Sequence, residues 1–306
     1  MATRHTYAST DNLRDYLSGT SYSSGWTSDG ASLRLILEAQ SRRIDDYCGG
    51  GAFGPLLESR YFDIGRGNLR HSYQPSVYGT PAGEIGNAET LVNMIPLDGW
   101  LISAATVTAY GQTARTDNTT LSEGYGADYW LLPYNSNPKT IFQLNEDTSN
   151  SLSAGQQTLL INGQWGYTAD TISLTTADAI ASTTATSVSV ASAADLSPAM
   201  AILVDSEQCY ITAISGNTLT VERSTNGTTG ATHSGGATVY RYDYEPLIAQ
   251  ACLDLAKIVF RDRDLGRVDA IGGEGVDITR SSREAVQVLN TLDAYRVAST
   301  SNGVVF

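Results

Sequence analysis

Residues 201–222 read AILVDSEQCYITAISGNTLTVE and form the most regular pattern in the chain. Two runs rich in Ile, Val, Thr and Tyr flank a Ser-Gly-Asn turn at 215–217, which predicts a β-hairpin. The next stretch, 226–231, lacks large apolar residues and is expected to be a surface loop. A last strand is predicted at Ala237 to Tyr242. Together these segments predict a small β module.

Toward the N-terminus the same kind of pattern continues from about Ser59. Short runs rich in Val, Ile, Thr, Tyr and Trp alternate with Gly, Pro and Asn as far as Arg241, which indicates strands and turns. The composition changes near 167–176, because the earlier part holds long Gly/Tyr/Pro loops and the later part is rich in Ala, Ser and Thr. Two β regions are therefore expected.

Helical periodicity is confined to the two ends of the chain. A short helix is expected from Thr10 to Gly19, and a longer amphipathic one from about Asp29 to Cys48. Another begins at Pro246 and repeats apolar residues to Arg261, and a final helix is capped near Ser281 or Ser282.

These patterns predict an α+β protein. Its N- and C-terminal helices would form a discontinuous α-helical bundle with a large inserted β region, including a small β-sandwich or barrel-like module. The expected domains are 1–60, the first part of the helical core; 61–170, a β-rich insertion with long loops; 171–242, the small β module; and 243–306, the second part of the helical core with a C-terminal tail.

Charge and cysteine content exclude several classes. The 19 basic and 32 acidic residues give a net charge of −13, which argues against a protein that grips nucleic acid through its phosphates. The three cysteines are far apart and form no C-x-x-C pair, so no disulfide framework or zinc site is indicated. No apolar run has the length of a signal peptide or membrane span, and synthesis in the cytoplasm with no membrane partner is expected.

Motifs for catalysis are absent from the sequence, and the few candidates are weak. The best candidates for metal ligands are Asp205, Glu207 and His233, because acids and histidines bind metals. The favoured interpretation is that these three are solvent-facing residues of a strand or turn. Asp45 and Asp46 are adjacent and cannot share a helix face, which disfavours a paired-carboxylate site. The glycines at 272–275 follow no predicted strand and indicate a linker. We therefore expect no enzyme activity, catalytic residue, cofactor or metal.

Several phrases, in order, resemble the head-to-tail connector, or adaptor, proteins of tailed bacteriophages. They are SRRIDDYCGGGAF at 41–53, RYF at 60–62, IPLD at 95–98, YWLLPYN at 129–135, INGQWGY at 161–167, ISGNTLTVER at 214–223 and NGTTGATH at 226–233. Together with the helix at 246–261, the resemblance covers most of the chain.

The resemblance implies a structural protein of the virion neck. Twelve copies would form a ring below the portal, extend the channel through which DNA passes without specific binding, and offer a docking platform for the stopper, tail terminator or another tail protein. The expected interface residues are Trp165, Tyr167, Tyr295, Val304, Val305 and Phe306, of which the last three form an apolar tail predicted to dock on the portal or a neighbour.

Two alternatives remain open at this point. Another phage structural component, such as a baseplate or fibre-associated β protein, would use the central β region as its working part. A carbohydrate-binding module would use exposed aromatic residues, of which the chain has a large number, with 17 Tyr, 5 Phe and 4 Trp.

Overall fold

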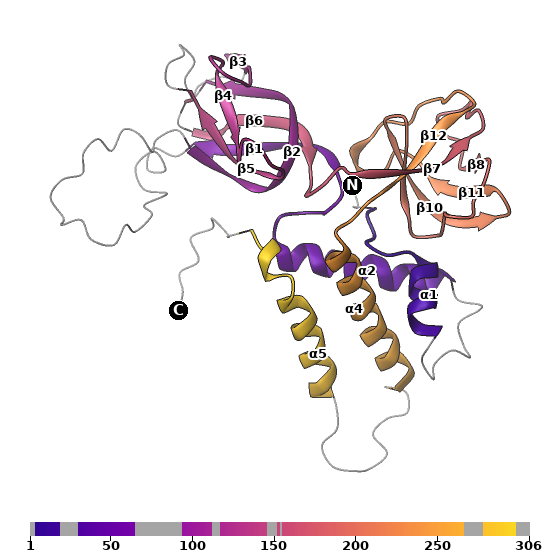
Figure 1. Ribbon diagram of the computed structural model, residues 1–306. Helices are drawn as coiled ribbons and strands as arrows, with labels where there is room; N and C mark the ends of the chain where they lie inside the picture. The colour runs from indigo at the N-terminus through magenta and orange to yellow at the C-terminus, as the bar shows by residue number, and fades with distance from the viewer. Residues whose placement is uncertain are drawn as a thin grey trace. The chain divides into compact units, whose positions relative to one another are not determined.

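The computed structural model describes residues 4–18, 30–64, 94–111, 117–145, 152–153, 155–265 and 278–297 (Figure 1). The chain divides into two compact units. The helix–barrel unit combines Met1–Leu56 with Thr168–Ala298, and the sheet unit is built on Leu57–Tyr167. Within the described residues, no helix has the length and apolarity needed to cross a membrane.

The sheet unit is a six-stranded antiparallel sheet. Its strands are β1 (Leu56–Ile64), β2 (Met94–Tyr110), β3 (Asn118–Leu121), β4 (Tyr129–Leu132), β5 (Lys139–Leu144) and β6 (Gly155–Trp165). They follow the order β1-β6-β2-β5-β4, and β3 also pairs with β2. The long strand β2 pairs with β5 through its first half and with β6 and β3 through its second. Large apolar side chains including Leu101, Phe142 and Trp165 fill one core.

The β strands of the helix–barrel unit form a second six-stranded antiparallel sheet. They are β7 (Thr171–Ala177), β8 (Ser187–Ser189), β9 (Ala201–Val204), β10 (Glu207–Ser215), β11 (Thr218–Glu222) and β12 (Ala237–Tyr242), in the order β7-β12-β9-β10-β11-β8. A bridge between Ala177 and Val190 joins the two edges of the sheet. The sheet thus closes into a small barrel, which removes most of its open edge.

The predicted hairpin and last strand are confirmed. β10 pairs with β11 up to Ser215 and Thr218, so Gly216 and Asn217 form a two-residue turn. Gly216 has a φ of 57°, a left-handed conformation that glycine adopts at little cost. β12 has the bounds that its sequence pattern predicted.

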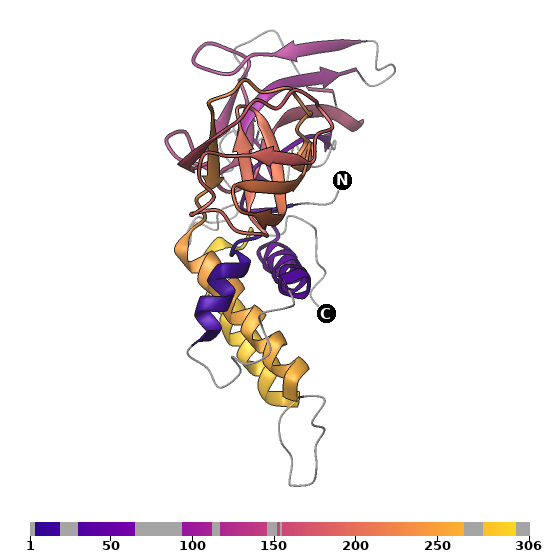
Figure 2. The same ribbon diagram turned by 90° about the vertical axis from the view of Figure 1, so that its right-hand side faces the viewer.

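Four helices complete the helix–barrel unit in the described residues: α1 (Thr10–Ser18), α2 (Gly30–Cys48), α4 (Pro246–Leu265) and α5 (Ile278–Asn290). α4 contacts α1, α2 and α5. Figures 1 and 2 show α1, α4 and α5 side by side with α4 in the middle, while α2 runs across them next to the barrel. α5 begins a few residues before the predicted cap at Ser281 or Ser282.

The expected fold, a helical bundle with a β insertion, is wrong. The described chain is mostly β, with two six-stranded sheets and more residues in strands than in helices. The helices also share their core with the barrel. The Tyr210 hydroxyl of β10 donates to Glu38 of α2 at 2.7 Å, and Arg34 of α2 donates to the Thr212 carbonyl at 3.2 Å.

Polar residues on the buried side of α2 are bonded in part by the N-terminal segment. Gln40, Ser41 and Asp45 are buried there and need hydrogen-bond partners. The extended segment 4–9 supplies two of them, because the Tyr7 amide donates to Ser41 Oγ at 3.2 Å and the Tyr7 hydroxyl donates to Asp45. The N-terminal segment therefore belongs to the same core as the helices.

Candidate functional site

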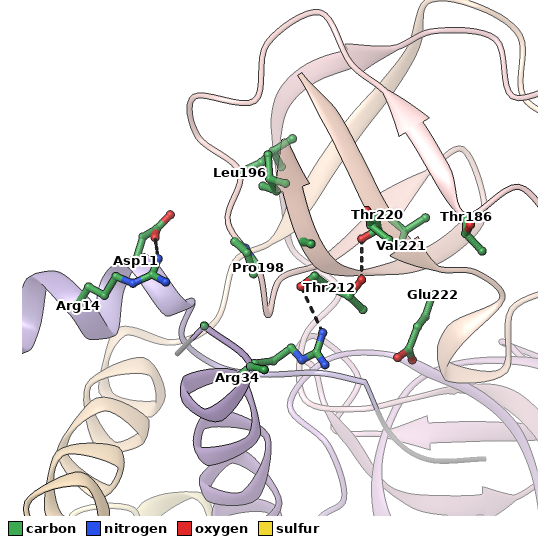
Figure 3. Close-up of a pocket in the computed structure, with 14 residues that line it drawn as sticks. Asp11, Arg14, Arg34, Thr186, Leu196, Pro198, Thr212, Thr220, Val221 and Glu222 are labelled. Atoms are coloured by element: carbon green, nitrogen blue, oxygen red, sulfur yellow. Dashed lines mark hydrogen bonds and ion pairs between the residues drawn. The ribbon is translucent and has the colours of Figure 1, made fainter. Parts of the chain in front are cut away.

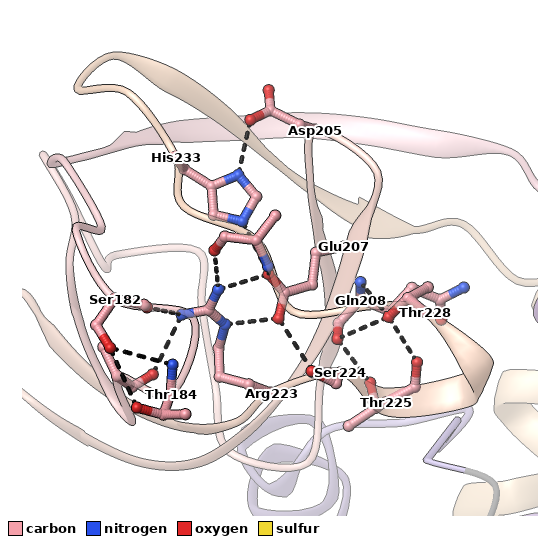
Figure 4. Close-up of polar contacts among 12 residues, drawn as sticks. Ser182, Thr184, Asp205, Glu207, Gln208, Arg223, Ser224, Thr225, Thr228 and His233 are labelled. Atoms are coloured by element: carbon pink, nitrogen blue, oxygen red, sulfur yellow. Dashed lines mark hydrogen bonds and ion pairs between the residues drawn. The ribbon is translucent and has the colours of Figure 1, made fainter.

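A buried charge cluster lies at one end of the barrel, and Figure 4 shows its side chains. It consists of Asp205, Glu207, Arg223 and His233. Glu207 is 0% exposed and His233 is 5% exposed. The expectation that these residues face solvent is therefore wrong for both, although Asp205 keeps an exposed side chain.

Glu207 is the centre of the cluster. Its carboxylate accepts two hydrogen bonds from Arg223, from Nε at 2.6 Å and from Nη2 at 2.5 Å. The backbone amides of Ser224 and Ala231 donate to it at 3.1 and 3.0 Å. Burial alone would raise the pKa of Glu207, but the bonds from Arg223, Ala231, His233 and Ser224 outweigh it and lower the pKa to about 2.

His233 lies between two carboxylates rather than at the centre of a metal site. Its Nδ1 is 2.7 Å from Asp205 Oδ2, and its Nε2 is 2.9 Å from Glu207 Oε2. The carboxylates face opposite nitrogens of the ring, so the three side chains do not converge on one point. Across the described ranges, no group of His, Cys, Asp or Glu is arranged to hold a metal ion.

The loop after β11 completes the cluster; its predicted surface position holds for Gly227 and Thr229, which are exposed, and is wrong for Asn226 and Thr228. It contains the short helix η3 (Thr225–Gly227), in which Thr225 and Asn226 are buried, and Thr228 beyond it is also buried. Gly230 lies so close to its neighbours that a Cβ there would be 2.7 Å from Ser224 Oγ. The loop is therefore packed at Asn226, Thr228 and Gly230 and exposed to solvent between them.

A second buried polar cluster joins the barrel to the N-terminal segment. His5 Nδ1 lies 2.7 Å from the Tyr244 hydroxyl, and its Nε2 lies 3.0 Å from the Pro55 carbonyl and 3.1 Å from Asn226 Nδ2. Gln208 of β10 donates to the same Pro55 carbonyl at 2.9 Å. Burial lowers the pKa of His5 to about 4, so the ring is neutral in the folded protein near pH 7.

A groove of about 1020 Å³ runs between α1, α2 and the barrel strands β10 and β11 (Figure 3). Its charged residues already have partners within the chain: Arg14 contacts Asp11 at 2.7 Å, Arg34 contacts Glu38 at 3.6 Å, and Glu222 contacts Arg4 at 2.9 Å. The remaining walls are largely apolar and include Leu196, Pro198, Ile214 and Val221. A concave, largely apolar surface of this kind is a candidate binding site.

The expected interface residues do not gather in one place. Trp165 is 1% exposed and belongs to the core of the sheet unit, where the Arg60 guanidinium lies 4.1 Å from its ring centroid. Tyr167 is half-buried against the Trp100 edge in the same unit. Tyr295 is half-buried against Phe53 in the helix–barrel unit. Val304, Val305 and Phe306 lie outside the described residues.

Sequence reasoning missed the partner of Glu207 and two exposed apolar side chains on α2 and α5. Arg223 follows β11 directly, and a basic residue after a strand carries no signal of a buried ion pair. Val286 on α5 is 52% exposed and Leu35 on α2 is 66% exposed. Helical periodicity identifies the buried face of a helix and gives no signal for apolar residues that stay exposed on another face.

The comparisons with known proteins return nothing for this chain: no family model matches it, and neither a curated protein nor a solved structure is significantly similar.

Proposed function

We propose that this chain is a structural subunit of a phage head-to-tail connector. In this proposal twelve copies form a ring below the portal, extend the DNA channel, and carry the stopper or the tail. The proposal rests on the resemblance of ordered sequence phrases to adaptor proteins and on how the folded chain uses its reactive side chains.

One observation carries most of the weight. Several side chains that could do chemistry are buried inside the fold, while a few large apolar side chains are exposed on its surface. Glu207, His233, His5 and all three cysteines are buried in internal contacts. In contrast, Leu35, Val286 and Tyr134 are more than half exposed and Tyr125 is fully exposed. These exposed apolar side chains are available for contact with a partner protein.

The charge of the molecule supports the passage of DNA through such a ring. A net charge of −13 on each copy would make the ring repel the phosphate backbone, so the duplex would slide rather than adhere. This role needs no sequence-specific contact with bases.

Electron microscopy of the protein mixed with the portal protein encoded beside it tests the proposal. The expected result is a stacked ring with the mass of twelve chains of 32.6 kDa, about 390 kDa. A glycan array run on the same sample addresses the carbohydrate-binding alternative. Absence of the protein from the portal vertex of intact virions would end the connector proposal.

A further inference from the structure

Two helices of the helix–barrel unit present outward faces on opposite sides of α4. α4 contacts α1 on one side and α5 on the other, and the two views in Figures 1 and 2 agree on this order. Each outer helix buries one stripe of side chains toward α4 and leaves another stripe exposed. The exposed stripes differ in charge.

The exposed stripe of α1 is acidic. Leu13 and Leu17 are buried, whereas Asp11, Asp15 and Ser18 are exposed at positions i, i+4 and i+7 and therefore share a face. Asp11 pairs with Arg14 at 2.7 Å. Asp15 makes no ion pair with any described residue, so its charge is available to another chain.

The exposed stripe of α5 is basic and apolar. Arg283, Val286, Gln287 and Asn290 are exposed at i, i+3, i+4 and i+7, while Ala285 and Leu289 are buried. The Glu284 carboxylate pairs with Arg261 of α4 at 2.8 Å, so the acid of this helix faces inward. Within the part of the chain that the structure describes, Arg283 has no ion-pair partner.

We propose that the exposed stripe of α5 on one copy packs against the exposed stripe of α1 on a neighbouring copy. Arg283 then pairs with Asp15, and Val286 is covered by α1. The inference rests on the proposed connector function and specifies which surfaces meet in the ring. The occupant is a second copy because each chain carries both halves of a charge-complementary pair.

The position of the stripes determines the kind of assembly. The contact joins two different surfaces that lie on opposite sides of α4, so it is heterologous and leaves one free surface at each end of a dimer. Further copies add until the rotation closes the ring. A contact between identical surfaces would stop at two copies.

Disulfide trapping tests this contact in the full-length protein. Ser18→Cys and Gln287→Cys introduce one exposed thiol on each stripe and leave Asp15, Arg283 and Val286 in place. The three native cysteines are buried and do not compete. On oxidation we expect a ladder of cross-linked species that extends beyond the dimer. The control variant combines Ser18→Cys with Asp195→Cys. Asp195 is an exposed residue of the barrel outside the proposed contact, so cross-linking in this variant gives the level that random collision produces.

Charge reversal in the same cysteine variant tests the ion pair. Arg283→Glu and Asp15→Arg are each expected to reduce the ladder at least tenfold, and the two reversals together to restore it to within about twofold. Arg43→Glu, on the exposed face of α2, is the matched control and is expected to change nothing. A ladder no stronger than collision, a product that stops at the dimer, or reversals without effect would each overturn the proposed contact.

The outcomes separate this contact from the connector function. A stacked ring on the portal without the disulfide ladder leaves the connector proposal standing and removes the α1–α5 contact. If the cross-linked ladder depends on the charges but no ring forms on the portal, the α1–α5 contact is supported and the connector proposal is contradicted.

Discussion

Glu207 is expected to be important for the stability of the barrel. It is fully buried and neutralised by Arg223, whose side chain is 5% exposed. Removing one partner of a buried ion pair leaves the other charge uncompensated, which typically costs 3–5 kcal/mol. We therefore expect Glu207→Gln to lower the free energy of unfolding by about 3 kcal/mol in urea denaturation.

The matched control for this prediction is Glu222→Gln. Glu222 also pairs with an arginine, Arg4, but both side chains are partly exposed, at 43% and 31%. Exposed pairs contribute about 0–1 kcal/mol because water screens them. Equal losses of stability in the two variants would contradict the central role of Glu207.

His5 makes stability depend on pH with a defined sign. Its pKa is about 4 in the folded protein and 6.5 in the unfolded chain, so the unfolded chain binds more protons between these values. The contribution of His5 is fully present above pH 6.5 and is lost as the pH falls toward 4. Burial raises the pKa of Asp45 to about 7. Asp45 therefore makes the free energy of unfolding decrease with rising pH, over a pH range that overlaps that of His5.

Because the pH dependences from His5 and Asp45 oppose each other, the contribution of His5 is measured by comparison with a variant that lacks the histidine. The difference in free energy of unfolding between the wild type and His5→Gln should fall by about 1.2 kcal/mol for each unit by which the pH is lowered from 6 to 4.5. Urea titrations at several pH values measure it. A difference that stays constant over this range would show that the His5 ring does not remain neutral in the folded state.

At the scale of the element, α2 has two faces with different roles. Leu37 is 0% exposed in the core of the helix–barrel unit, whereas Leu35 is 66% exposed two residues earlier. We expect Leu37→Ala to destabilise the protein by about 2–5 kcal/mol, because it removes buried contacts and leaves a cavity. Leu35→Ala should change stability by less than about 0.5 kcal/mol. Thermal unfolding followed by circular dichroism compares the two, and similar losses would contradict the assigned faces.

Elements with a local signal were predictable from the sequence, and those that depend on distant partners were not. The Gly216-Asn217 turn and the strand that ends at Tyr242 carry their signal in neighbouring residues. The loop that contains Asn226 looked exposed because its side chains are small and polar. Asn226 is buried nevertheless, because its Nδ2 donates to Gln208 Oε1 at 2.8 Å and its Oδ1 accepts a bond from the Arg4 amide at 2.7 Å. Neither partner is adjacent in sequence.

The same distinction explains the wrong fold class and the wrong exposure of the charge cluster. Apolar periodicity showed that the terminal helices need partners, but not that the barrel would supply some of them. Glutamate is a residue type that is mostly exposed, and bonds from Arg223, from the Ser224 and Ala231 amides and from His233 make the burial of the Glu207 carboxylate tolerable.

At the scale of the whole molecule, the two compact units have separate cores and are expected to unfold separately. Three of the four tryptophans, Trp100, Trp130 and Trp165, belong to the sheet unit. In a Trp26→Phe background, tryptophan fluorescence therefore reports on the sheet unit alone, while far-UV circular dichroism follows both units.

A substitution at Gly230 can then destabilise one unit selectively. In Gly230→Ala the new Cβ would lie 2.7 Å from Ser224 Oγ and 2.9 Å from the Thr183 carbonyl oxygen, and such overpacking costs about 1–3 kcal/mol. Gly235→Ala is the control, since its Cβ meets nothing closer than 3.5 Å. We expect Gly230→Ala to shift the circular dichroism transition to lower urea and to leave the fluorescence transition unchanged. If both transitions moved together, the two units would be one cooperative structure, and the charge cluster of the barrel would also stabilise the sheet unit.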